Sequence, residues 1–102
     1  MYNAPFSATA AGTNAGASAT KAAITGHTYV VTAFSGHTDT GSILQILDGT
    51  TVVWQSAINV TVEGLSFHFS GLNVVCTLSA AAVGKIVTST TSCQANICGY
   101  IV

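Results

Sequence analysis

Residues 42–58 read SILQILDGTTVVWQSAI, and this stretch points to the fold class. Ser42–Leu47 and Thr50–Ile58 are rich in aliphatic, β-branched and aromatic residues, which favours two extended strands. Between them, Asp48-Gly49 is a dipeptide typical of type I′ turns, because glycine accepts a positive φ there. The stretch therefore predicts a tight β-hairpin.

Further segments of the same kind lie on both sides of this hairpin, and none carries a convincing helical stripe. Short strands separated by turn signals predict an all-β fold, an antiparallel β-sandwich or jelly-roll-like barrel of seven to eight strands. The length of 102 residues suits a single domain, which we place at residues 21–102. The other predicted strands are His27–Phe34, Leu65–Ser70, Leu72–Ser79, Lys85–Thr91 and Ala95–Val102, with a small-residue turn at Ala80–Gly84.

Alternation within the strands predicts which side chains face the core. In Leu65–Ser70, Phe67 and Phe69 share one face and His68 lies on the other. Cys76 shares a face with Leu72, Val74 and Leu78, which predicts a buried thiol that packs as a small apolar group.

One predicted strand is apolar on both faces, which suits a strand that is covered on both sides. His27–Phe34 has Val30, Thr32 and Phe34 on one face by strict alternation, and Tyr29, Val31 and Ala33 on the other. The last strand ends in Tyr100-Ile101-Val102, and an apolar strand of this kind should be paired or packed.

Residues 1–20 are low in complexity, with Tyr2 and Phe6 as the only large side chains. Glycine, serine and threonine among the alanines oppose a helix. We predict an extended N-terminal arm that lies on a neighbouring subunit, with Tyr2 and Phe6 as anchors; simple terminal disorder is the alternative.

Ionised residues are scarce, at two lysines and three acids, with a net charge of −1. Two separated lysines make no phosphate-binding patch and no polybasic membrane contact, so neither nucleic acid nor a membrane is an expected partner. The start lacks the features of a signal peptide, which predicts synthesis in a host cytoplasm. Weak repulsion between copies favours a surface that is covered by identical subunits or a larger assembly.

The tripeptide Gly-His-Thr occurs at residues 26–28 and 36–38 and suggests a paired-histidine metal site. Ten extended residues span roughly 33 Å, however, whereas the ligands of one zinc lie a few ångströms apart. We therefore expect His27 just before a strand and His37 in the loop after it, with no metal and no cofactor.

No catalytic constellation is visible. Cys93 and Cys98 are five residues apart, so one continuous strand places them on opposite faces, where they cannot form a disulfide. The hairpin uses Asp48, which leaves Asp39 and Glu63 as an unconvincing glycosidase pair. We predict that the protein is not an enzyme.

Four motifs in residues 41–102 carry a family resemblance: ILDGTTVVW, FHFSGLNV, CTLSAAAVG and NICGYIV. Together they resemble small capsid decoration (cement) proteins of tailed bacteriophages. The resemblance implies a β-sandwich on the capsid surface of a virion, commonly a homotrimer, with the major capsid protein as its partner.

Under this hypothesis the candidate assembly contacts are Tyr2, Phe6, His68 and Tyr100. The alternative is a tail or fibre-tip module that recognises a cell-surface glycan. Such a module needs exposed aromatic side chains, for which Trp54, Tyr29 and Tyr100 are the candidates. In a hairpin of this kind, Trp54 is more often a core residue.

Overall fold

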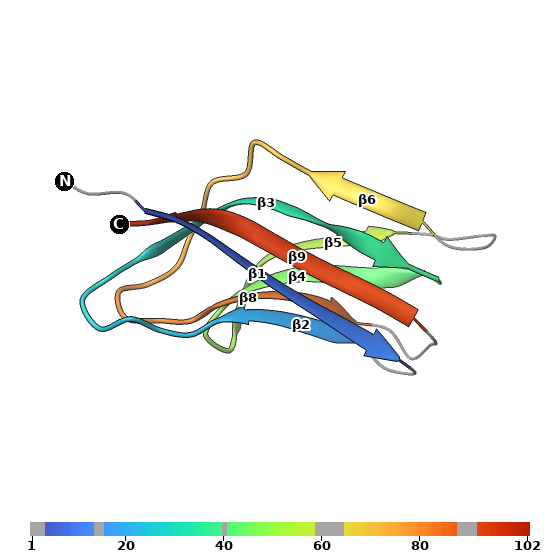
Figure 1. Ribbon diagram of the computed structural model, residues 1–102, viewed down its shortest axis with the longest axis horizontal. Coiled ribbons are helices and arrows are strands. Elements are labelled where there is room, and N and C mark those ends of the chain that lie inside the picture. Colours follow the sequence, from blue (N-terminus) through green and yellow to red (C-terminus); the bar gives the residue numbers. More distant parts are fainter. Residues whose placement is uncertain (1–3, 14–15, 40, 59–64, 88–91) are drawn as a thin grey trace.

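The computed structural model describes residues 4–13, 16–39, 41–58, 65–87 and 92–102, whose strands form two antiparallel sheets (Figure 1). Sheet A has the order β1-β9-β3-β6, with β7 also paired to β3, and sheet B has the order β2-β8-β4-β5. The described residues contain no helix. Their strands are β1 (Ala4–Thr13), β2 (Ala17–Lys21), β3 (Tyr29–Thr38), β4 (Ser42–Asp48), β5 (Thr51–Ile58), β6 (Leu65–Phe69), β7 (Val74–Val75), β8 (Ala82–Val87) and β9 (Ser92–Ile101).

The two sheets pack against each other over one core, which confirms the predicted all-β sandwich. Phe34 and Ile97 from sheet A, and Leu44, Ile46 and Ile86 from sheet B, are each at most 1% exposed. All of them belong to a single hydrophobic cluster. The molecule is elongated along its strands, with principal extents of 46 × 22 × 18 Å.

The predicted hairpin is confirmed as β4 and β5, with Asp48 paired to Thr51. Its turn differs from the predicted type. Gly49, the first loop residue, has a φ of 63°, whereas Thr50 does not take a positive φ. A positive φ at the first loop residue alone is the type II′ pattern, so Asp48 ends the strand and is not part of the loop.

The N-terminal segment is extended, as predicted, but its described residues are built into the sandwich of their own chain. β1 pairs with β9 along its whole length, and β2 pairs with β8. The expected boundary at residue 20 falls inside β2. The inward side chains of β2 are small: Ala17 and Ala19 are at most 4% exposed. Alternate alanines form an inward face, but they do not form a conspicuous apolar stripe in the sequence.

A bulge in β3 changes which side chains face the core. The register of β3 against β9 shifts between Val31 and Ala33. One extra residue reverses the facing of every later side chain, so Phe34 joins Tyr29 and Val31 in the core, all three 0% exposed. The predicted facing of Phe34 was therefore wrong.

The segment after β6 contains less strand than predicted. Of Leu72–Ser79, only Val74–Val75 is a strand, although the Leu72 and Cys76 N–H groups donate hydrogen bonds to carbonyl groups of β3. Cys76 is buried as expected, but Leu78 is 67% exposed, contrary to its predicted core position.

β8 begins at Ala82, earlier than predicted, so the expected turn at Ala80–Gly84 is partly strand. Its first inward positions are small because the opposite sheet lies close. A Cβ atom added at Gly84 would lie 2.2 Å from Cγ2 of Ile97. The terminal strand is paired on both sides, β9 lying between β1 and β3, as its apolar sequence predicted.

Candidate assembly surface

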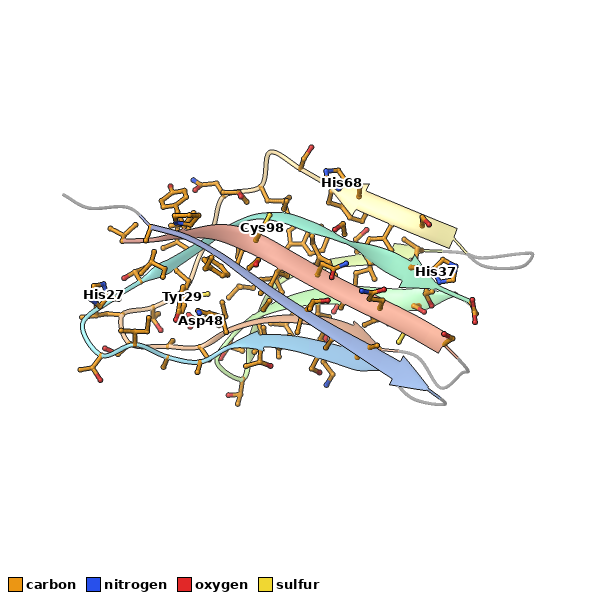
Figure 2. The ribbon with its side chains drawn as sticks, viewed as in Figure 1. His27, Tyr29, His37, Asp48, His68 and Cys98 are labelled. Atoms are coloured by element: carbon orange, nitrogen blue, oxygen red, sulfur yellow. The ribbon has the colours of Figure 1, made fainter. Side chains whose placement is uncertain are left out.

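The two Gly-His-Thr repeats do not form a metal site. Figure 2 shows His27 and His37 at opposite ends of the molecule. His37 lies within β3, not in the loop predicted for it, because β3 continues to Thr38. Its Nε2 atom is 3.7 Å from Oδ1 of Asp39, on a partly exposed pair. No cluster of three His, Cys, Asp or Glu residues able to hold a metal occurs in the described ranges.

No disulfide joins the three cysteines, two of which are buried. Burial, together with the nearby charge of Asp48, raises the pKa of Cys76 to about 11. Burial also raises the pKa of Cys93. Both shifts disfavour the reactive thiolate. Cys98 is exposed on the outer face of sheet A, so Cys93 and Cys98 lie on opposite faces, as predicted.

Asp48 has a structural role at the end of β4. Its Oδ2 atom accepts a hydrogen bond from the Thr77 N–H, and its Oδ1 atom accepts one from the Thr77 hydroxyl, each at 3.0 Å. The neighbouring Gly49 N–H donates to the carbonyl of Ala81 at 2.8 Å. These contacts tie the β4–β5 hairpin to the segment between β7 and β8.

Two of the aromatic residues considered for sugar binding face inward. Tyr29 is 0% exposed and donates its hydroxyl proton to the Ala22 carbonyl, and burial raises its pKa. Trp54 packs its ring at 5.3 Å from Phe69 and 6.2 Å from Phe34 between the sheets. Neither ring is a free platform on which a sugar could stack.

The predicted assembly contacts lie in different environments. Phe6 is 7% exposed and packs 4.9 Å from Tyr29 in the core of its own chain. His68 is exposed on the outer face of sheet A, and Tyr100 is half-buried on that face, between Pro5 and Val30 of the neighbouring strands. Tyr2 lies outside the described residues.

The outer face of sheet A is mainly polar. One row across it consists of Thr9, Asn96, Ser35 and His68, each paired to the next on the adjacent strand. The Thr9 hydroxyl donates to the Asn96 side-chain oxygen. One apolar row also crosses this face near the chain ends, where Pro5, Tyr100, Val30 and Val75 pair in turn and Val75 is 55% exposed.

The outer face of sheet B is more apolar, because two apolar rows cross it. In the first row, Ile43 of β4 lies between Val87 of β8 and Ala57 of β5. Ile43 and Val87 are 38% and 40% exposed, values far above those of core residues. This row presents aliphatic groups to solvent from three neighbouring strands.

The second apolar row contains Leu47 of β4, with Val83 of β8 and Val52 of β5 on either side. A bulge here places Val53 beside Val52, and both valines are 44% exposed. At a bulge, two residues of one strand lie opposite one residue of the next. Here the extra valine on β5 widens the apolar row at the edge of sheet B.

A polar row separates the two apolar rows. Lys85, Gln45 and Gln55 lie side by side on β8, β4 and β5, with Ser18 next to Lys85 on β2. The Gln45 amide donates to the Gln55 side-chain oxygen at 2.9 Å. We call the three rows together the sheet B face; within the strands of sheet B, Lys85 is the ionisable residue on this face.

The sequence interpretation missed the sheet B face, although a signal was present. ILQIL in β4 and TVVW in β5 carry apolar residues on both faces of the strand. A strand with one solvated face instead alternates apolar and polar residues. Such runs indicate a strand that is covered on both sides. Here one side is the core, and the other is exposed in the single chain.

Comparisons with protein-family models, with curated proteins and with solved structures found no match. Within the described residues, no helix is long and apolar enough to cross a membrane.

Proposed function

We propose that this protein is a structural, non-enzymatic β-sandwich that associates with its own copies and decorates or cements the capsid of a bacteriophage. The observation that carries the proposal is the sheet B face, where Ile43, Val52, Val53 and Val87 are each about two-fifths exposed. An exposed aliphatic face with little charge is typical of a surface that another protein covers. The resemblance of residues 41–102 to capsid decoration proteins suggests which assembly that is.

The physical basis of cementing is burial of this face at a joint between shell subunits. Apolar area removed from water contributes roughly 25 cal/mol per Å², so a few hundred Å² per copy stabilises a joint by several kcal/mol before the costs of association. A protein that binds only the assembled shell then shifts the shell's stability by mass action, by about 2.7 kcal/mol at a hundred times its Kd.

The proposal is tested on particles purified from the organism that makes this protein. Quantitative mass spectrometry should find it at a copy number comparable to that of the major shell protein. Particles stripped of it should melt at a lower temperature and recover when the purified protein is added back. A few copies per particle would assign it to a tail instead, and equal melting with and without it would remove the cement role.

A further inference from the structure

We infer that the sheet B face is the site of self-association, and that its occupant is the same face of a second copy of this chain. The inference deepens the proposed function, on which it rests, by naming the surface and the partner. Four of the seven large hydrophobic residues that are exposed in the described structure lie on this face: Ile43, Val52, Val53 and Val87.

The pattern of the face is self-complementary. A polar row runs through its middle, with one apolar row at the level of Ile43 and another at the level of Leu47. A two-fold axis along the strands lays each apolar row on its own copy. An axis across the strands lays one apolar row on the other. In both cases aliphatic side chains meet each other and the polar row meets a polar row, as an isologous interface requires, but only the axis along the strands, at the centre of the face, keeps the two Lys85 side chains apart.

Charge also favours a second copy. Lys85 is the single ionisable residue on this face, and the whole chain carries a net charge of −1, so two copies approach with little repulsion. A nucleic acid or an anionic membrane would need a basic cluster, which one lysine does not supply. The side-chain amides of Gln45 and Gln55 retain donors and acceptors for hydrogen bonds across the joint.

The size of the face sets the expected affinity. Four strands about 4.8 Å apart, with about six residues each rising about 3.3 Å, give a face of about 19 by 20 Å. Two such faces together amount to about 760 Å², which is smaller than the roughly 1,200–2,000 Å² that stable, specific interfaces bury. We therefore expect a weak, concentration-dependent dimer in free solution, which becomes firm where copies are held close together, as on a shell.

Sedimentation equilibrium of the full chain from micromolar to millimolar concentration tests this. The wild type should shift from monomer to dimer, and Ile43→Lys should weaken association about tenfold, because it places a further charge among the aliphatic side chains of the joint. Ser35→Lys is the matched control, since it adds the same charge to a central strand on the outer face of sheet A. It should associate like the wild type, and circular dichroism should show both variants folded.

Cross-linking locates the contact independently of any loss of association. In a Cys98→Ser background, Gln45→Cys places one thiol near the centre of the face, where a two-fold axis brings the two copies together. A short bis-maleimide should cross-link this variant into dimers. The wild type carries its exposed thiol, Cys98, on the opposite side of the sandwich and should cross-link far less.

The outcomes separate this inference from the proposed function. Association that Ile43→Lys leaves intact, or that Ser35→Lys abolishes, overturns the sheet B face as the contact, while the structural role stands. A chain that remains monomeric at millimolar concentration, yet binds particles through Ile43, assigns the face to a shell protein and overturns the second copy. Absence from particles removes the proposed function, whatever the dimer does.

Discussion

Gly84 and Ile97 meet between the two sheets, and this contact provides a sharp test of the packing. Gly84 lies at an inward position of β8, and Ile97 of β9 is 1% exposed. A Cβ atom at Gly84 would lie 2.2 Å from Cγ2 and 3.5 Å from Cβ of Ile97. Since carbon atoms in contact are about 3.5–4.0 Å apart, Gly84→Ala forces a movement of more than about 1 Å.

The effect on the free energy of unfolding depends on whether the Ile97 side chain can move away from the new methyl group. Cγ2 branches from the Cβ atom of Ile97, whose χ1 is stiff, so it cannot turn away as the end of a long side chain would. We expect Gly84→Ala to lower the free energy of unfolding by about 1–3 kcal/mol through overpacking. Without the clash, the same change would stabilise the protein by about 0.4–1 kcal/mol, because alanine restricts the unfolded chain.

Ile97→Ala removes the obstructing methyl group and completes a double-mutant cycle. Alone it should cost about 2–5 kcal/mol, since it leaves a cavity in the core. In its presence, Gly84→Ala should become neutral or stabilising, so the two changes should couple by more than about 1 kcal/mol. A stabilising osmolyte can keep the weakest variants folded during the comparison.

Urea unfolding followed by circular dichroism measures all four proteins, and fluorescence of Trp54, the single tryptophan, supplies a second probe. The thermal unfolding midpoint should fall by about 4–8 °C for each kcal/mol of lost stability in a chain of this size. Neutral behaviour of Gly84→Ala in the wild type, or an equal penalty in the Ile97→Ala background, would refute the close approach of β8 and β9.

Two further predictions concern Asp48 and the thiols. Asp48→Ala removes the acceptor of both Thr77 hydrogen bonds and should lower the free energy of unfolding by about 1–2 kcal/mol in urea, whereas Thr77→Val, which keeps the N–H donor, should lose about half of that. An unchanged urea midpoint for Asp48→Ala would contradict the structural role. A thiol reagent at neutral pH should modify Cys98 rapidly and Cys76 only on unfolding, and equal rates in the native protein would contradict the burial. The pKa of Cys76 rises on folding from 9.0 to about 11, so its contribution to stability is complete below pH 9 and is lost as the pH rises toward 11. Unfolding free energies measured over that range should fall less steeply in Cys76→Ala than in the wild type.

Much of the strand pattern was predictable from local signals. The β4–β5 hairpin follows from turn chemistry and β-propensity, and the alternation in β6 correctly buries Phe67 while exposing His68. The burial of Cys76 and the separation of Cys93 from Cys98 also follow from period two. These features depend on neighbours within a few residues along the chain, so the local sequence is enough to predict them.

The candidate surface was predictable only in part. Low charge indicated a protein surface that tolerates contact with other copies, but the residues predicted for that contact were Tyr2, Phe6 and Tyr100 near the chain ends and His68 in β6. Phe6 instead packs within its own core, where its ring meets Tyr29. The exposed aliphatic residues around Ile43 carry no local mark that distinguishes them from core residues.

Local sequence signals are enough to specify that this chain forms short strands joined by tight turns, with one inward side chain at every second position. Which face of each strand meets the other sheet was decided by tertiary structure. A bulge at Thr32 reverses the facing of Phe34, and the pairing of the alanine-rich β1 and β2 with β9 and β8 draws the N-terminal segment into the sandwich. The physical reason is that period two identifies two faces without ranking them, and where both are apolar, as in β4, only the packing of distant strands decides which one remains exposed.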